Sequence, residues 1–183
     1  PNARIRMADS KGMTPPEQMF KAHDYKGDGE VYKDDLITVT AAENCHFGRG
    51  GAGDSGLDHS YSLRIQTPDK VILFSGDTGH CAAVAALAKG VDLMIHEVID
   101  LDLLENAMSK QLPPAIAQGL MRHMREEHTT AEDVGRLAKA AGVKQLVLNH
   151  IIPGQDEPDS VYLDPVKKHY DGPVTVARDL MSF

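Results

Sequence analysis

Short apolar runs, each bounded by glycine, proline or polar residues, follow one another along most of the chain. Runs of this kind, when rich in β-branched residues, are typical of strands. We expect strands at 36–42, 61–65, 70–76, 91–95, 144–150 and 172–177. A turn around Pro68 and Asp69 joins the second of these strands to the third.

Helical patterns fill the intervals between the later strands. The segment 81–90 is rich in alanine and stops at Gly90, as helices often do. Residues 100–127 are mostly helical in pattern, with an interruption at Pro113 and Pro114. A last helical pattern precedes the terminal strand.

The clearest helix is predicted at 129–142. Thr129 and Glu132 fit a capping box at its start, and Gly142 ends it. The apolar positions between them recur at the spacing of one buried helix face, namely Val134, Leu137, Ala138 and Ala141. Strands that alternate with helices in this way indicate α/β architecture with a buried, largely parallel sheet.

Composition and charge narrow the class of protein. The 183 residues, 42% of them hydrophobic and 25% charged, suffice for one domain with a sizeable core. Residues 1–35 form a polar, turn-rich lead-in. The net charge of −8 argues against a large nucleic-acid surface, and no apolar run reaches the roughly 20 residues of a membrane helix.

The two cysteines, Cys45 and Cys81, form no paired motif. We therefore expect free thiols in a reducing compartment. The cytoplasm is the expected location, although any targeting segment would precede Pro1, where the sequence begins.

Side chains that can bind a metal, carboxylates and imidazoles, lie at the ends of three of the apolar strands. They are Asp77, the pair His96 and Glu97, and His150. Parallel strands would bring them to one edge of the sheet, where ligands of α/β proteins bind. Each residue alone could simply end a strand in solvent, but carboxylates and imidazoles at all three ends favour a divalent metal such as zinc.

Four segments carry a more specific resemblance: VTAAENCHF (39–47), FSGDTGH (74–80), LMIHEV (93–98) and HTTAEDVGRLAKAAGVKQLVLNHIIPG (128–154). Together they resemble the C-terminal half of a metallo-β-lactamase-fold hydrolase. Within that superfamily they are most similar to the branch of ribonuclease Z and the arylsulfatase-like hydrolases. The resemblance covers roughly Val39 to Gly154.

The resemblance implies roles for five residues of this chain. His46 would be a ligand of the first metal, Asp77 would bridge two metals, and His150 would be a ligand of the second. Glu97 and His128 would act together near the leaving group. The implied cofactor is one or two zinc ions or another divalent metal.

The implied reaction is hydrolysis of a small-molecule phosphoester, sulfoester or carboxylic ester by a metal-bound hydroxide.

One signature of the resembled family is absent from the sequence: H-x-H-x-D-H, which supplies most metal ligands and lies before everything seen here. We therefore expect residues 1–183 to form a single domain that is the C-terminal portion, half or more, of an αββα sandwich. Its first strands are missing, so an apolar sheet face should remain open. A homo-oligomer or another chain would cover that face.

Several alternatives stay open. His59 rivals His46 as a ligand, because the glycine-rich loop 48–56 between them is longer than the corresponding family segment. A truncated, non-catalytic member that acts as a binding module is the alternative to a hydrolase. A tRNA 3′-processing endonuclease ranks third, because the chain is acidic and shows no basic arm.

Overall fold

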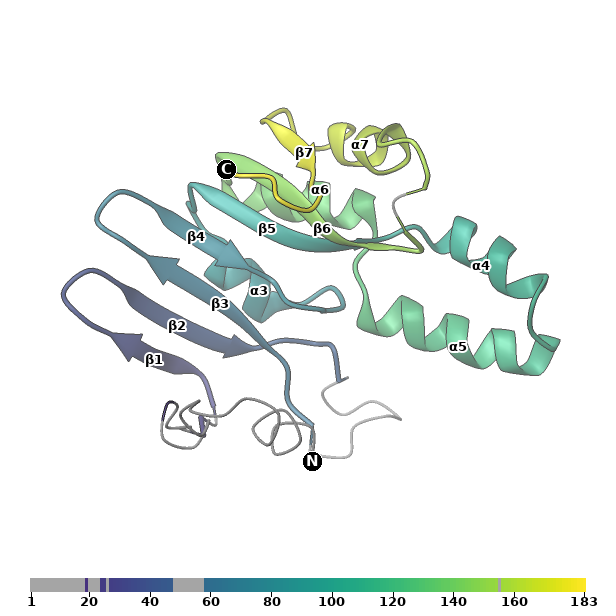
Figure 1. The fold of residues 1–183 in the computed structure, drawn as a ribbon, viewed down its shortest axis with the longest axis horizontal. Coiled ribbons are helices and arrows are strands. Elements are labelled where there is room, and N and C mark those ends of the chain that lie inside the picture. The colour runs from purple at the N-terminus through teal and green to yellow at the C-terminus, as the bar shows by residue number, and fades with distance from the viewer. Residues whose placement is uncertain (1–18, 20–23, 26, 48–57, 155) are drawn as a thin grey trace, which may run out of the picture.

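The computed structural model describes residues 19, 24–25, 27–47, 58–154 and 156–183; the glycine-rich loop lies outside them. The strands form one seven-stranded sheet, in which their order is their order along the chain (Figure 1). They are β1 (Gly29–Lys33), β2 (Thr38–Glu43), β3 (Tyr61–Gln66), β4 (Val71–Phe74), β5 (Leu93–Ile99), β6 (Gln145–Ile152) and β7 (Val174–Val176).

The sheet has an antiparallel half and a parallel half. Strands β1 to β4 pair antiparallel, whereas β4 to β7 pair parallel. The prediction of a largely parallel sheet therefore holds only from β4 onward, where a helix separates each strand from the next. The first strand also lies inside 1–35, which we had predicted to be irregular.

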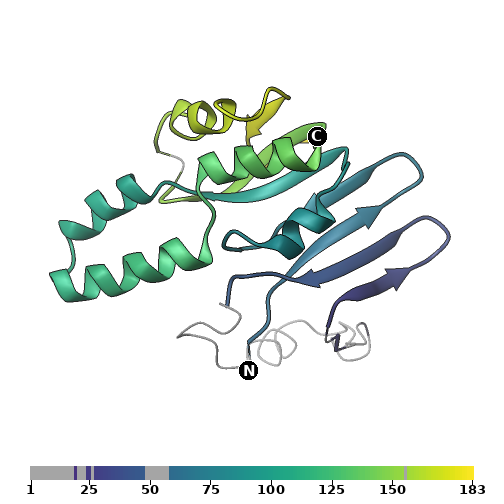
Figure 2. The same cartoon turned by 180° about the vertical axis from the view of Figure 1, so that it is seen from behind.

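The helices are α3 (Ala82–Leu87), α4 (Leu101–Ser109), α5 (Pro114–Glu127), α6 (Ala131–Ala141) and α7 (Ser160–Lys167). The strand order always advances in one direction, and crossovers between parallel strands are right-handed, so the crossover helices fall on the same face. Figure 2 shows α3 and α6 in front of the sheet, whereas they lie behind it in Figure 1. The α4–α5 pair projects beyond the sheet from the end of β5.

Helix α6 begins one residue later than its capping box predicted. Thr130, not Thr129, is the N-cap, and its hydroxyl accepts a hydrogen bond from the Asp133 N–H at 3.3 Å. The Thr129 hydroxyl instead donates to the Thr78 carbonyl at 2.6 Å. Gly142 ends the helix in the left-handed conformation, as predicted.

The core lies between the sheet and the crossover helices. Leu73, Met94, Leu146 and Leu148 of the central strands are buried against Val84 of α3 and against α6. Such burial of aliphatic side chains is the main source of stability in a fold of this kind.

The opposite sheet face is apolar and more exposed. Laterally paired residues point to the same face, which places the following side chains together: Val39, Leu63, Ile65, Ile72, Phe74 and Ile95. They are partly buried or, at Phe74, 39% exposed. None of the described helices covers them (Figure 1). Among the described residues this face is therefore less covered than the face that packs against α3 and α6, and the predicted open face remains an expectation.

No described helix has the length and apolar composition that a membrane span requires.

Candidate active site

The carboxyl ends of β4, β5 and β6 lie side by side because these strands run parallel. Asp77 lies in the turn after β4, Glu97 within β5 and His150 within β6. The His150 Nε2 atom is 3.4 Å from Asp77 Oδ2, and both side chains are partly exposed. Two of the three predicted metal ligands are therefore neighbours.

His150 is the extra residue of a β-bulge. The register pairs Asn149 and Ile151 with consecutive residues of β5, so His150 is left without a partner strand residue, and its φ is +42°. A bulge re-aims a side chain out of the alternating pattern of a strand. The prediction that the strand ends at His150 is wrong, because β6 continues beyond it. The bulge turns the imidazole toward the edge.

The Glu97 carboxylate is buried, with 1% of its side chain exposed. Its Oε1 atom accepts hydrogen bonds from the backbone N–H groups of Thr78 (3.2 Å) and Thr129 (3.0 Å). His128 Nδ1 lies 3.2 Å from the same oxygen. These donors compensate the cost of burying the charge. The second oxygen, Oε2, has no partner among the described residues.

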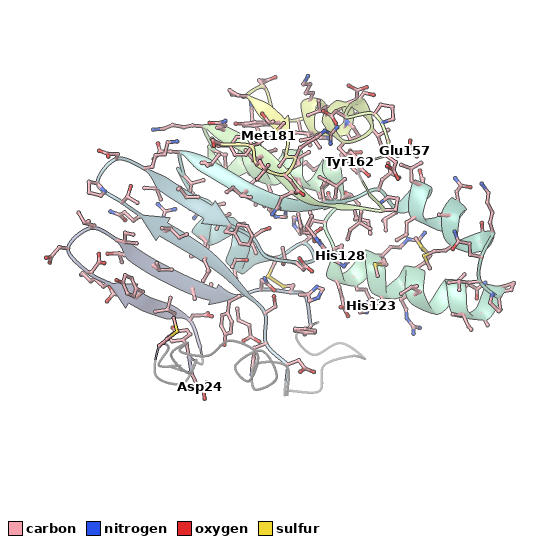
Figure 3. The ribbon with its side chains drawn as sticks, viewed as in Figure 1. Asp24, His123, His128, Glu157, Tyr162 and Met181 are labelled. Carbon is pink, nitrogen blue, oxygen red and sulfur yellow. A yellow bond between two sulfur atoms is a disulfide. The ribbon has the colours of Figure 1, made fainter. Side chains whose placement is uncertain are left out.

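The pKa of His128 is raised above its ordinary value. Burial by itself lowers it, but the hydrogen bond to Glu97 and the negative charges of Glu97, Asp77 and Glu127 outweigh that effect. Because the carboxylate accepts at Nδ1, it also fixes the ring and leaves Nε2 for other partners. Figure 3 shows His128 where α5 meets the sheet.

This raised pKa predicts a pH-dependent contribution to stability. The His128–Glu97 ion pair should stabilise the fold fully below the ordinary histidine pKa of about 6.5 and lose its effect as the pH rises through the raised value. Urea unfolding of the wild type and of Glu97→Gln across pH 6 to 9 measures it. The difference in the free energy of unfolding between the wild type and Glu97→Gln should shrink with rising pH. A difference that stays constant across this range would contradict the assignment of the ion pair.

His46 lies on the segment after β2, beside the end of α5. Its ring Nδ1 atom is 3.1 Å from the Glu127 carbonyl oxygen. Its backbone N–H donates a hydrogen bond to the Asn44 side-chain oxygen at 3.1 Å. The ring centroids of His46 and His128 are 5.3 Å apart, and those of His128 and His150 are 6.0 Å apart. The three imidazoles therefore form a row, with Asp77 beside its last member.

The rival His59 has a different partner. Its Nδ1 atom is 2.8 Å from the Glu43 carboxylate, and its ring packs near Tyr61.

His96, the neighbour of Glu97, is 1% exposed, and its Nδ1 atom is 2.7 Å from the Glu97 carbonyl oxygen. Burial lowers the pKa of His96. These contacts favour a structural role for His96 in the interior of the fold.

The two cysteines are paired, contrary to our expectation of free thiols. Cys45 and Cys81 form a disulfide, with their Cα atoms 5.6 Å apart. The fold brings the segment after β2 against the turn after β4, a contact that the spacing of the two residues could not reveal. Cys45 N–H also donates to the Thr78 hydroxyl at 3.3 Å. The disulfide therefore ties the segment that carries His46 to the turn that carries Asp77.

The donors fit part of a metal centre. A carboxylate and an imidazole converge at Asp77 and His150, which are ligand types that zinc accepts. Among the described residues, however, no group of three or more His, Cys, Asp or Glu side chains is arranged to hold an ion. The remaining ligands of a complete centre would have to come from elsewhere.

Sequence reasoning missed some residues that build the site. Thr78 and Thr129 hold Glu97 through their backbone N–H groups, and Glu127 contacts His46 through its carbonyl. Backbone contacts of this kind leave little signature in side-chain identity. Asn44 lies two positions before His46 in the sequence, and its buried side-chain amide donates a hydrogen bond to the Ser75 carbonyl at 3.1 Å.

The profile of the family described as Beta-lactamase superfamily domain matches residues 7–151. The chain belongs to this family. Curated relatives include the ribonuclease Z of Myxococcus xanthus, 32% identical over 64% of this chain and 33% of the relative. The ribonuclease Z of Mycobacterium sp. strain KMS is 30% identical over 81% of this chain and 45% of the relative. The chain thus spans between a third and a half of the length of these relatives.

Solved structures agree on the metallo-beta-lactamase fold. YhfI from Bacillus subtilis, described as a metallo-beta-lactamase fold protein, superposes with a TM-score of 0.58 at 17% identity, over 84% of this chain and 52% of that one. The isothiocyanate hydrolase from Delia radicum gut bacteria gives 0.59 at 14% identity, over 90% and 60%. At such identities the likeness establishes the fold alone.

Proposed function

We propose that this beta-lactamase superfamily chain supplies part of the active site of a metal-dependent hydrolase that cleaves phosphoesters. The observation that supports this proposal most is the buried Glu97–His128 pair beside the converging Asp77 and His150 side chains. A buried, hydrogen-bonded acid–imidazole pair next to a partial metal site suits ester hydrolysis.

In this proposal Asp77, His150 and His46 would each supply a ligand to a metal centre that ligands from outside the described residues complete. Zinc is the ion that these donor types favour. When bound, it would polarise the ester and stabilise the negative charge that develops on it.

His128 would donate a proton to the leaving oxygen. Glu97 keeps the His128 Nδ1 proton engaged at 3.2 Å, so Nε2 is the nitrogen left to meet the substrate. The raised pKa of His128 keeps more of the ring protonated near neutral pH, as a general acid requires.

The names of the curated relatives bear on the substrate. The name ribonuclease Z denotes an enzyme that cleaves RNA, which argues against our expectation, drawn from the net charge, that the chain has no large nucleic-acid surface. It also favours a phosphodiester over a sulfoester or a carboxylic ester. RNA processing is therefore the second candidate function, and the acidic net charge of −8 speaks against it.

The test is zinc-dependent hydrolysis of diphenyl phosphate, whose phenolate leaving group benefits from a proton at neutral pH, by the protein that carries this sequence. We expect turnover with zinc and a kcat lower by about 100-fold in His128→Ala, the lower end of what a general acid contributes. His169→Ala is the matched control, since His169 pairs with Glu132 and has no predicted role in the site; its kcat should match the wild type.

Absence of turnover at every zinc concentration would contradict the proposal and favour a non-catalytic binding module. Equal kcat values in His128→Ala and the wild type would remove His128 from the mechanism. A short RNA with a 3′ trailer, assayed beside the ester, separates RNA processing from general phosphoester hydrolysis.

A further inference from the structure

The last turn of α5 contacts His46 through a backbone atom. The Glu127 carbonyl oxygen lies 3.1 Å from His46 Nδ1. A carbonyl oxygen can only accept a hydrogen bond, so Nδ1 must carry the proton. In the neutral imidazole the other nitrogen, Nε2, is then unprotonated and has a free lone pair, which is the form that binds a metal.

The neighbouring ring is held in the same way. His128 follows Glu127 directly, and its Nδ1 atom faces the Glu97 carboxylate, which already accepts two backbone hydrogen bonds. The two ring planes meet at 71°. The end of α5 therefore places two imidazoles side by side, each with its Nδ1 atom engaged.

Gly79 fixes how closely the end of α5 approaches the site. A Cβ atom built on Gly79 would lie 2.1 Å from the Glu126 carbonyl oxygen and 3.5 Å from the Cys45 carbonyl oxygen. The contact with the Glu126 carbonyl leaves no room for a Cβ atom at this position, whereas the distance to Cys45 is an ordinary van der Waals contact. The same turn is tied to Cys45 by the disulfide at Cys81.

We propose that the last turn of α5 is a positioning element for His46: the Glu127 carbonyl selects the Nδ1–H tautomer, and Gly79 sets the approach that makes this contact. The inference deepens the proposed function, on which its consequence for metal binding rests. A metal-ligating histidine whose second nitrogen is held by a carbonyl has a fixed tautomer and ring orientation. Neither Glu127 nor Gly79 needs to touch metal or substrate.

The first test needs no variant and no metal. Long-range ¹H–¹⁵N NMR spectra of the metal-free protein at alkaline pH report the tautomer of each neutral imidazole. We expect the Nδ1–H form for His46 and the Nε2–H form for the internal control His169, whose Nε2 atom is 3.1 Å from the Glu132 carboxylate. An Nε2–H form of His46 overturns the inference, whether or not the protein binds metal or hydrolyses esters.

The second test compares two glycine-to-alanine variants. Gly79→Ala should push the end of α5 away, mix the His46 tautomers and weaken zinc binding by about 10- to 100-fold, the usual cost of losing such a partner. Gly119→Ala, in the middle of α5, introduces a Cβ with nothing within 4 Å. It should leave both the tautomer and the zinc affinity unchanged.

Wild-type tautomer and wild-type zinc affinity in folded Gly79→Ala would overturn the inference. If Gly79→Ala does not fold, the wild-type NMR spectrum decides alone. Loss of the proposed function has a different signature, because a protein that binds no zinc and turns over no ester can still show the expected His46 tautomer.

Discussion

Replacing Glu97 with alanine is expected to lower the free energy of unfolding by about 3–5 kcal/mol, the usual cost of removing one partner of a buried ion pair. The variant loses the acceptor of the Thr78 and Thr129 N–H groups and the partner of His128. Each buried N–H left without an acceptor adds its own desolvation cost. Urea unfolding followed by circular dichroism measures the loss.

The matched control is Glu105→Ala. Glu105 pairs with Arg125 at 2.9 Å, but both side chains are more than half exposed. Exposed pairs contribute little, so this change should stay within about 1 kcal/mol of the wild type. A loss below about 1 kcal/mol in Glu97→Ala would show that the carboxylate, whose Oε2 atom has no described partner, does not hold these segments together.

The parallel half of the sheet could be predicted because its signal is local. The apolar runs 70–76, 91–95 and 144–150 are each followed by a helical pattern, and the periodicity of α6 correctly identified its buried face. The four polar residues at the ends of these runs, Asp77, His96, Glu97 and His150, were also local signals. The parallel topology then brought Asp77 and His150 within 3.4 Å, as expected from the shared edge.

The remaining features depend on contacts between distant segments. Thr129 and Thr130 are equally good caps by type, and only the Thr78 carbonyl, far away in sequence, draws the Thr129 hydroxyl away from α6. The disulfide likewise required the knowledge that Cys45 and Cys81 meet. A one-residue bulge at His150 cannot be read from strand alternation, because it breaks that alternation.

Replacing His150 with alanine should weaken zinc binding by at least about 100-fold, at or beyond the upper end of what loss of a second-shell partner costs. His150 Nε2 is the nitrogen that faces Asp77 Oδ2, so the variant removes one of the three ligands that we assign to the metal among the described residues. Asp77 and His46 alone offer too few ligands, since catalytic zinc sites normally keep three from the protein. His59→Ala is the control, because His59 pairs with Glu43 instead.

The measurement that tests the account most directly is a calorimetric zinc titration of the chelator-treated protein that carries this sequence and of these two variants. The account predicts zinc binding by the wild type, a matching isotherm for His59→Ala, and a loss of at least about 100-fold in affinity for His150→Ala. A wild-type protein without zinc binding, or a His150→Ala variant that titrates like the wild type, would contradict the assignment of Asp77 and His150 to a metal centre.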